Sequence, residues 1–304
     1  MNGDAAARLW PDFSANEGYR WYYVDAVVDD LLVVAIFMRA PVFSARELSR
    51  QKRGENVPAA AVNAAIYRNG RREGWVFSEF ARADVSSDGI AIGASTLSWQ
   101  GDAAKVHIDG RQSPWPTQMK LDLTLTAMAP AAREVVLAEA GDHRWQALMP
   151  RATVALTRGG TTRQGHGYHD TNHGRRALGV DLSRWRWTRV HGPDETDIYY
   201  LPEGPGAGVH VRADRISTVT SACEEDSENM LQATSGWGLP LPRALRHRGR
   251  VLAPGQLIES SPFYARLWQR EGGIDALTEI ADFGRFRSPL FSWMSYFRSR
   301  AEAA

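Results

Sequence analysis

Short β-type segments separated by turn residues recur along the chain. Residues 61–68 and 75–80 flank a turn containing Asn69-Gly70, a dipeptide suited to the left-handed conformations of a two-residue hairpin turn. Strands joined in this way form antiparallel sandwiches or barrels rather than parallel sheets with crossover helices. The chain is therefore predicted to be mainly β. Further strands are expected at 21–28, 31–38, 119–127, 152–157, 197–201 and 209–212.

The length of 304 residues fits one large or two modest domains. Residues 128–142 contain Pro130 and show no two-residue alternation, so we expect them to cross between two β units. The predicted domains are 1–135 and 136–304. Near the C-terminus, 273–283 has helical spacing and 291–298 is aromatic with a basic end, which predicts a short C-terminal helical segment.

The charge balance and the cysteine content exclude several protein classes. Lys plus Arg number 36 and Asp plus Glu 35, so no net field attracts nucleic acid. The single cysteine, Cys223, rules out an internal disulfide framework and fits a reducing compartment. The longest apolar run, 31–38, is far below the roughly 20 residues that span a bilayer, and the N-terminus has no signal-peptide pattern. We expect a cytoplasmic protein.

The segment GHGYHDTNHG at 165–174 holds the densest polar cluster. His169 and His173 have the spacing of zinc ligands on a helix, but the glycines around them disfavour a helix, and no metal is expected. In a strand, His166, Tyr168, Asp170 and Asn172 share one face, and His169 points to the other. The histidines could equally be exposed or hydrogen-bonded groups of a polar strand.

Asp170 admits two interpretations. It could form a salt bridge with Arg175 or Arg176, which is an ordinary structural role. In a buried aromatic pocket, desolvation would instead raise its pKa and make it an acid that works near neutral pH.

Aromatic residues are abundant, with eleven tryptophans, nine tyrosines and ten phenylalanines. Many of them suit core packing. They could also line an apolar tunnel whose ring faces stabilise a cation. The candidates for that role are Trp21, Tyr22, Tyr23, Trp185 and Trp187.

Taken in order, these motifs resemble the carotenoid 1,2-hydratases (hydroxyneurosporene synthases) of the lipocalin-like superfamily. The resemblance covers nearly the whole chain. It runs through GYRWYYVDAVVDD at 18–30, PVFS at 41–44, VNAAIY at 62–67, HRW at 143–145, GYHDTNHG at 167–174, WRWTR at 185–189, SPFYAR at 261–266 and GRFRSPLFSWMSYFR at 284–298. His169 stands where the family commonly has a hydrophobic residue.

The resemblance implies two tandem lipocalin-like β-barrel or sandwich domains. It also implies a cofactor-independent hydro-lyase that adds water to the terminal C1–C2 double bond of an acyclic carotenoid such as neurosporene or lycopene. The family's functional positions fall on His143, Trp145, Tyr168 and Asp170, with Asp170 as proton donor. Substrate contacts are expected from Trp21, Tyr23, Glu79, Asn172, Trp185 and Trp187.

Two other functions stay open at this level. The cation made by Asp170 could be captured by a neighbouring alkene, which would make the protein a terpenoid or polyene cyclase or isomerase. The chain could also be a non-catalytic carrier of an apolar ligand. Because a carotenoid dissolves in the bilayer, residues 291–298 are a candidate for peripheral contact with the inner membrane, the alternative being a helix docked on the domain.

Overall fold

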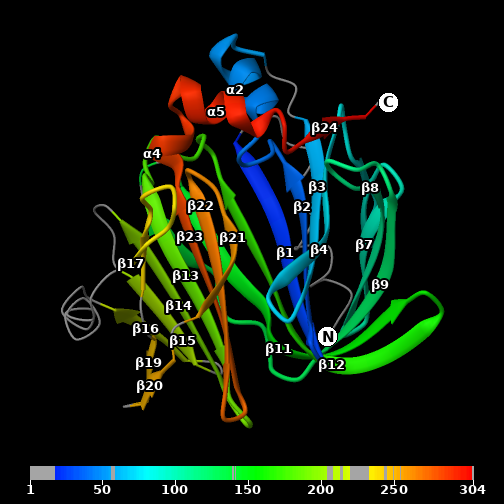
Figure 1. Ribbon diagram of the computed structural model, residues 1–304, viewed down its shortest axis with the longest axis vertical. Helices are drawn as coiled ribbons and strands as arrows, with labels where there is room; N and C mark the ends of the chain where they lie inside the picture. Colours follow the sequence, from blue (N-terminus) through cyan, green and yellow to red (C-terminus); the bar gives the residue numbers. More distant parts are fainter. Residues whose placement is uncertain are drawn as a thin grey trace.

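The chain folds into two curved sheets with short helices at one end (Figure 1). A computed structural model describes residues 18–55, 59–138, 140, 142–203, 208–212, 215–219, 233–242, 245–248, 250–253 and 255–302. Cys223 lies outside these residues. The prediction of a mainly β chain is confirmed.

The larger sheet has thirteen strands and combines segments from both halves of the chain. Their spatial order is β24-β4-β3-β2-β1-β12-β11-β9-β8-β7-β6-β5, with β10 paired to β11. Among the described strands of this sheet, only the pairing of β24 with β4 is parallel. The strands are β1 (Tyr19–Val28), β2 (Leu31–Arg39), β3 (Ala60–Arg68), β4 (Arg71–Phe80), β5 (Asp84–Val85), β6 (Gly89–Ile92), β7 (Ser95–Gln100), β8 (Ala103–Arg111), β9 (Gln118–Ala127), β10 (Val135–Ala138), β11 (His143–Arg158), β12 (Thr161–Gly174) and β24 (Arg300–Ala301).

The smaller sheet has seven strands in the order β16-β15-β14-β13-β23-β22-β21. They are β13 (Arg184–His191), β14 (Thr196–Glu203), β15 (Gly208–Arg212), β16 (Arg215–Val219), β21 (Gln256–Ser260), β22 (Tyr264–Glu271) and β23 (Ile274–Asp282). Two short hairpins accompany this sheet, made of β17 (Ala233–Thr234) with β18 (Pro240–Leu241) and β19 (Leu245–His247) with β20 (Arg250–Leu252).

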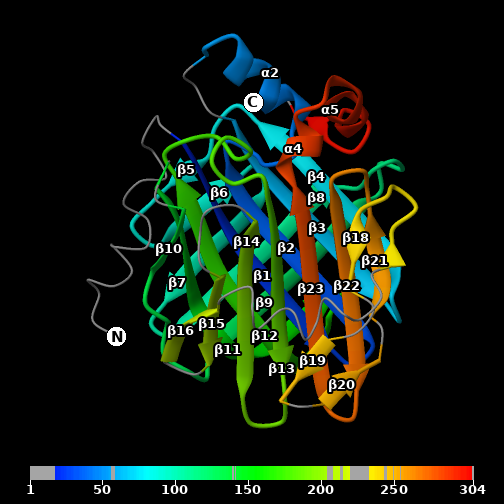
Figure 2. The same cartoon turned by 90° about the vertical axis from the view of Figure 1, so that its left-hand side faces the viewer.

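The larger sheet curls so that β6–β9 cover one face of β1–β4, and the smaller sheet covers the other face (Figures 1 and 2). Strands β1–β3 are therefore the middle of three layers. All ten residues of β1 are buried, because its two sets of alternating side chains enter two separate cores. This explains why residues 21–28 and 31–38 are apolar almost without interruption.

Helices α2 (Ala45–Lys52), α4 (Phe283–Phe286) and α5 (Pro289–Ser295) lie at one end of the sheets (Figure 1). Ser44 caps the N-terminus of α2, since its hydroxyl accepts a hydrogen bond from the Glu47 amide at 3.0 Å. The expected C-terminal helical segment is thus present as α4 and α5. Of the helices in the described ranges, none combines the length and apolar composition that a bilayer crossing requires.

The predicted Asn69-Gly70 hairpin is confirmed, since both residues have positive φ, at 49° and 74°, between β3 and β4. The helical interpretation of 273–283 is wrong, because 274–282 form β23. This strand is hydrogen-bonded on both sides and every one of its residues is buried, so it has no polar face to produce a two-residue alternation.

The expected crossing at 128–142 contains one strand, β10, which pairs with the start of β11. The proposed boundary between 135 and 136 falls inside β10, and the larger sheet continues on both sides of it. A division into 1–135 and 136–304 therefore stays a prediction about folding units.

Candidate active site

Asp170 lies in the middle of β12, on the face that the smaller sheet covers. Its Oδ2 atom accepts two hydrogen bonds, from Trp145 Nε1 at 2.9 Å and from the Tyr168 hydroxyl at 2.8 Å. Its Oδ1 atom is buried and has no hydrogen-bond partner within the described part of the chain. Tyr168 stands two residues before Asp170 on the same strand, so the expected shared face is confirmed.

Burial raises the pKa of the Asp170 carboxyl to about 8. The hydrogen bonds from Trp145 and Tyr168 oppose this rise, whereas the negative charges of Glu279 and Asp25 add to it. The carboxyl therefore stays protonated near neutral pH.

The salt-bridge alternative for Asp170 does not hold, whereas His169 is a hydrogen-bonded histidine of the strand, as the alternative for the histidines expected. Arg175 pairs with Asp142 at 3.3 Å and Arg176 with Asp181 at 3.0 Å, so neither arginine neutralises Asp170. The histidines diverge: His166 lies near Asp275, His173 lies near Glu134, and His169 enters the opposite core, next to Trp99. Among the described residues, no group of three or more His, Cys, Asp or Glu side chains is arranged around a common point.

Two rows of side chains face each other between the sheets at the level of Asp170. Cross-strand pairing defines the row of the larger sheet, which runs over β11, β12, β1, β2, β3 and β4 and consists of Ala147, Asp170, Tyr23, Ile36, Asn63 and Phe77. The row of the smaller sheet runs over β14, β13, β23, β22 and β21 and consists of Tyr200, Trp187, Glu279, Arg266 and Glu259. The Tyr23 hydroxyl joins the rows by donating to Glu279 Oε1 at 2.9 Å.

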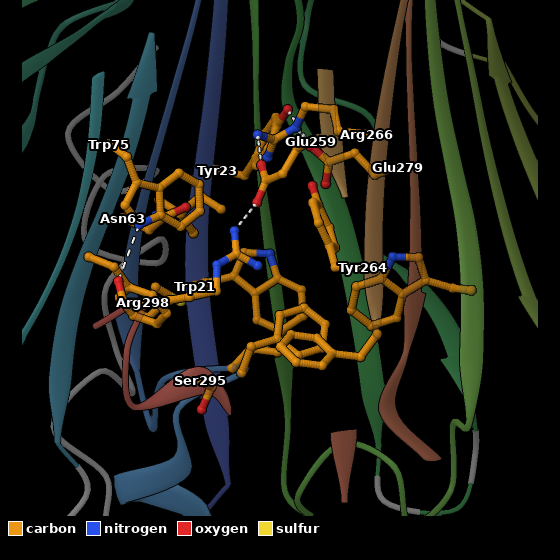
Figure 3. Close-up of a pocket in the computed structure, with 17 residues that line it drawn as sticks. Trp21, Tyr23, Asn63, Trp75, Glu259, Tyr264, Arg266, Glu279, Ser295 and Arg298 are labelled. Atoms are coloured by element: carbon orange, nitrogen blue, oxygen red, sulfur yellow. Dashed lines mark hydrogen bonds and ion pairs between the residues drawn. The ribbon is translucent and has the colours of Figure 1, made fainter. Parts of the chain in front are cut away.

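A pocket that is partly open to solvent occupies the space between the rows (Figure 3). Its walls are mostly aromatic and aliphatic, from Trp21, Ile36, Met38, Val42, Phe43, Trp75, Phe77, Trp185 and Phe263. Asp170 is not among the lining residues. Tyr23 lines the pocket and is the next residue in the row, and the Trp187 ring lies 5.5 Å from the Tyr23 ring. The pocket therefore ends one side chain away from Asp170.

The predicted substrate-contacting residues take different places. Trp21, Tyr23 and Trp185 line the pocket. The Trp187 ring lies 5.2 Å from the Tyr168 ring, at the closed end. Asn172 accepts a hydrogen bond from the Tyr200 hydroxyl at 3.2 Å, beyond the lining residues.

Glu79 does not line the pocket. Its carboxylate accepts the Ser44 hydroxyl at 2.7 Å and pairs with Arg46 at 3.1 Å, so it holds the start of α2.

His143, at the start of β11, lies among aromatic rings rather than beside the Asp170 carboxyl. Its ring centroid is 5.5 Å from that of Tyr19 and 6.0 Å from that of Trp185. Burial lowers the pKa of His143 to about 3, so the imidazole is neutral. Neither ring nitrogen has a hydrogen-bond partner among the residues that the structure describes.

The charged wall of the pocket was not predicted from the sequence. Arg266 is only 1% exposed and lies between two carboxylates, with Nε 2.8 Å from Glu279 Oε1 and NH1 2.8 Å from Glu259 Oε2. Arg298 closes the cluster at 2.7 Å from Glu259 Oε1. The available signal was charged residues in the middle of otherwise apolar β-type runs, YARLWQR and IDALTEIAD.

Comparison with solved structures supports the fold. The chain is similar to an AttH protein of Nitrosomonas europaea, with a TM-score of 0.56 and 12% identity over 88% of this chain and 93% of that one. It is also similar to CghA, with a TM-score of 0.51 and 12% identity over 88% of each chain. These likenesses bear out the lipocalin-like fold class.

Sequence comparison identifies the family. The model of carotenoid hydratase CrtC matches residues 36–302. The acyclic carotenoid 1,2-hydratase of Thiocapsa roseopersicina is 30% identical, with 92% of this chain and 72% of that protein covered. The hydratase of the same name from Rubrivivax gelatinosus is 29% identical, with 84% of this chain and 65% of that protein covered. The chain therefore belongs to the carotenoid hydratase CrtC family, whose members are hydro-lyases.

Proposed function

We propose that this protein adds water to the C1–C2 double bond of an acyclic carotenoid and that Asp170 donates the proton, without a cofactor. The observation that carries the proposal is the Asp170 carboxyl itself. It is buried, its raised pKa keeps it neutral, and only one of its oxygens holds hydrogen bonds. An acid in this state can give a proton to an apolar substrate near neutral pH.

The two hydrogen bonds suit the charge that develops during donation. As the proton moves from Asp170 to C2 of the substrate, the carboxyl becomes a carboxylate. The donors on Oδ2, Trp145 and Tyr168, stabilise that negative charge and are in place before the reaction. The tertiary cation forms at C1, where the faces of Trp187 and Tyr23 can stabilise it. Water then bonds to C1 and loses a proton.

The route to Asp170 is part of the proposal. The pocket has the aromatic lining that a polyene needs, but it ends at Tyr23. The terminal isoprenoid unit must therefore displace the Tyr23 or Trp187 side chain to bring C2 to the acid. His143 and Trp185, which stack on each other, would hold the aromatic wall behind this movement.

The test is product analysis with purified protein and lycopene or neurosporene in detergent micelles. We expect a product heavier by one water, and we expect Asp170→Asn to lose at least about 10³-fold in rate, because the amide keeps the shape but has no acidic proton. Asp122→Asn, an identical change at an exposed position on β9, is the control and should retain activity. Hydration by Asp170→Asn at the wild-type rate would remove Asp170 from this role.

The same measurement separates the alternatives. An isomer without added mass would indicate that an alkene captures the cation, as in a cyclase or isomerase. Binding of the carotenoid without any turnover would indicate a carrier.

We further propose that the end of the molecule carrying α5 contacts the membrane surface. Three large apolar side chains there face solvent: Leu290 is 64% exposed, Trp293 57% and Phe297 67%. The other side of the helix buries Ser292 and Ser295, so the helix is docked and still presents an apolar face. Ser295 also lines the pocket, which would bring the substrate entrance close to the bilayer.

Flotation with phosphatidylethanolamine and phosphatidylglycerol vesicles tests this contact. Replacing Leu290, Trp293 and Phe297 together with Ser should abolish flotation. Val251→Ser, an exposed apolar residue on β20 at the opposite end of the molecule, is the matched control (Figure 2). If the triple variant floated as well as wild type, α5 would not be the membrane contact.

A further inference from the structure

The pocket presents one carboxylate that the proposed acid chemistry does not use. Glu279 lies in the middle of β23 and lines the pocket. Its cross-strand neighbours are Trp187 and Arg266. Figure 3 shows its side chain directed into the pocket beside Tyr264.

Glu279 and the nearby Glu259 have different surroundings. Glu259 holds donors on both oxygens, with Arg298 on Oε1 and Arg266 on Oε2, and its side chain is 5% exposed. For Glu279, the hydrogen bonds from Tyr23 and Arg266 both end on Oε1, the Tyr264 hydroxyl is a third hydrogen-bond partner, and the side chain is 12% exposed. The Glu279 carboxylate is therefore oriented by a guanidinium and two tyrosine hydroxyls while it still lines the pocket.

Glu279 also lies close to the acid. Its neighbours Trp187 and Tyr23 both contact the ring of Tyr168, whose hydroxyl binds Asp170. One sheet thus supplies a neutral carboxyl, and the opposite sheet supplies a carboxylate that is ion-paired with a buried arginine. A buried carboxylic acid on one sheet and an ion-paired carboxylate on the other, around one space, form the usual arrangement of a general acid and a general base.

We infer that Glu279 is the general base that takes the proton from the attacking water. This inference rests on the proposed hydration. Once Asp170 has protonated C2, a lone pair of the water oxygen forms the bond to C1. The water's O–H bond breaks, its electron pair stays on the oxygen, and the proton goes to the Glu279 carboxylate. After the product leaves, this proton passes through solvent to the Asp170 carboxylate, which restores both groups.

Arg266 is a positioning residue in this scheme, because its Nε holds Oε1 and orients the carboxylate even when Tyr23 moves to admit the substrate. The surrounding charges are balanced: Arg266 and Arg298 face Glu259 and Glu279. A balanced cluster in an otherwise apolar pocket is a suitable place for a single polar reactant, the water, beside a hydrocarbon substrate.

The test separates protonation from water capture by running the reaction in D₂O. In Glu279→Gln, Asp170 still delivers a deuteron to C2, but the cation is not captured and loses a proton again. We expect hydration to fall by about 10²-fold or more, while deuterium accumulates in the recovered carotenoid. Glu271→Gln, the same change at an exposed position of β22, is the control. Asp170→Asn should lose both hydration and deuterium uptake.

Two outcomes would overturn the inference: hydration by Glu279→Gln within a few-fold of wild type, or loss of both hydration and deuterium uptake in a folded variant. The second would mean that Glu279 acts only through Asp170 or through packing. If burying Gln beside Arg266 prevents folding, the double variant Glu279→Gln/Arg266→Met removes this ion pair, while Glu259 keeps Arg298 and Tyr67 as partners, and the result is read in the same way. A failure of the proposed function is distinguishable, because it would appear as missing hydration in the wild type or as an active Asp170→Asn.

Discussion

The two faces of β1 enter cores of different chemistry. Toward β6–β9 the strand presents Val24, Ala26 and Val28, and the surrounding core is mostly aliphatic. Toward the smaller sheet it presents Trp21 and Tyr23, and the surrounding core holds most of the aromatic rings together with the buried acids. One strand therefore separates a packing core from a pocket, and its alternating side chains belong to one or the other.

Neighbouring residues on β12 show what this difference means for a buried polar group. His169 and Asp170 are both buried, and they point in opposite directions. His169 enters the aliphatic core, where its Nδ1 atom lies 2.7 Å from the Tyr23 carbonyl oxygen. Asp170 enters the aromatic core, where two side-chain donors meet one of its oxygens. Burial alone thus does not mark a site, since the donors and the pocket beside the group decide its role.

The largest effect on stability is expected from Asp170. Its pKa is raised to about 8 in the folded protein, compared with 3.8 without burial, so the unfolded chain loses this proton at lower pH than the folded one. The free energy of unfolding of wild type should therefore fall as the pH rises from about 4 to 8. Asp170→Asn has no titrating carboxyl at this position and should not show this fall. Each pH unit changes the free energy of unfolding by about 1.4 kcal/mol. Between pH 5 and pH 8, the free energy of unfolding of Asp170→Asn should therefore rise by up to about 4 kcal/mol relative to that of wild type.

Urea unfolding of both proteins at the two pH values measures this gain, with Asp122→Asn as control. If the free energies of unfolding of wild type and Asp170→Asn changed with pH in parallel, the aromatic core would not hold this carboxyl neutral.

A matched pair of leucines compares the two cores directly. Leu121 on β9 is buried in the aliphatic core, and Leu277 on β23 is buried in the aromatic core, two residues before Glu279. Each change to Ala should cost about 3 kcal/mol in the free energy of unfolding, because it leaves a cavity. Only Leu277→Ala should also slow hydration per folded molecule, because its cavity loosens the strand that carries Glu279. Equal activities of the two variants would show that the aromatic core tolerates displacement as well as the aliphatic one.

Local patterns in the sequence predicted the parts of the fold that depend on local chemistry. Asn69-Gly70 specified its turn because both residues adopt positive φ, and the alternation around Tyr168 specified which side chains share a face. Strand β23 has no visible strand period in the sequence, because it is buried on both faces. Which acids meet in the pocket depends on how the two sheets pack, so Glu279 and Arg266 escaped notice.

The smallest effect is expected from His169→Leu in the aliphatic core. The Tyr23 carbonyl accepts from Nδ1, so Nε2 must be the unprotonated nitrogen, and it has no donor within the described residues. Burial also lowers the pKa of His169 to about 4, so the ring is neutral at pH 7. The change to leucine removes one hydrogen bond, which destabilises the fold, and one buried unsatisfied nitrogen, which stabilises it. The two contributions to the free energy of unfolding are of similar size and opposite sign. We expect the free energy of unfolding to change by less than about 1 kcal/mol, and hydration to stay within about twofold. A large loss of activity at unchanged stability would show that the two faces of β12 are coupled through Tyr23, and that the aliphatic core takes part in positioning the pocket.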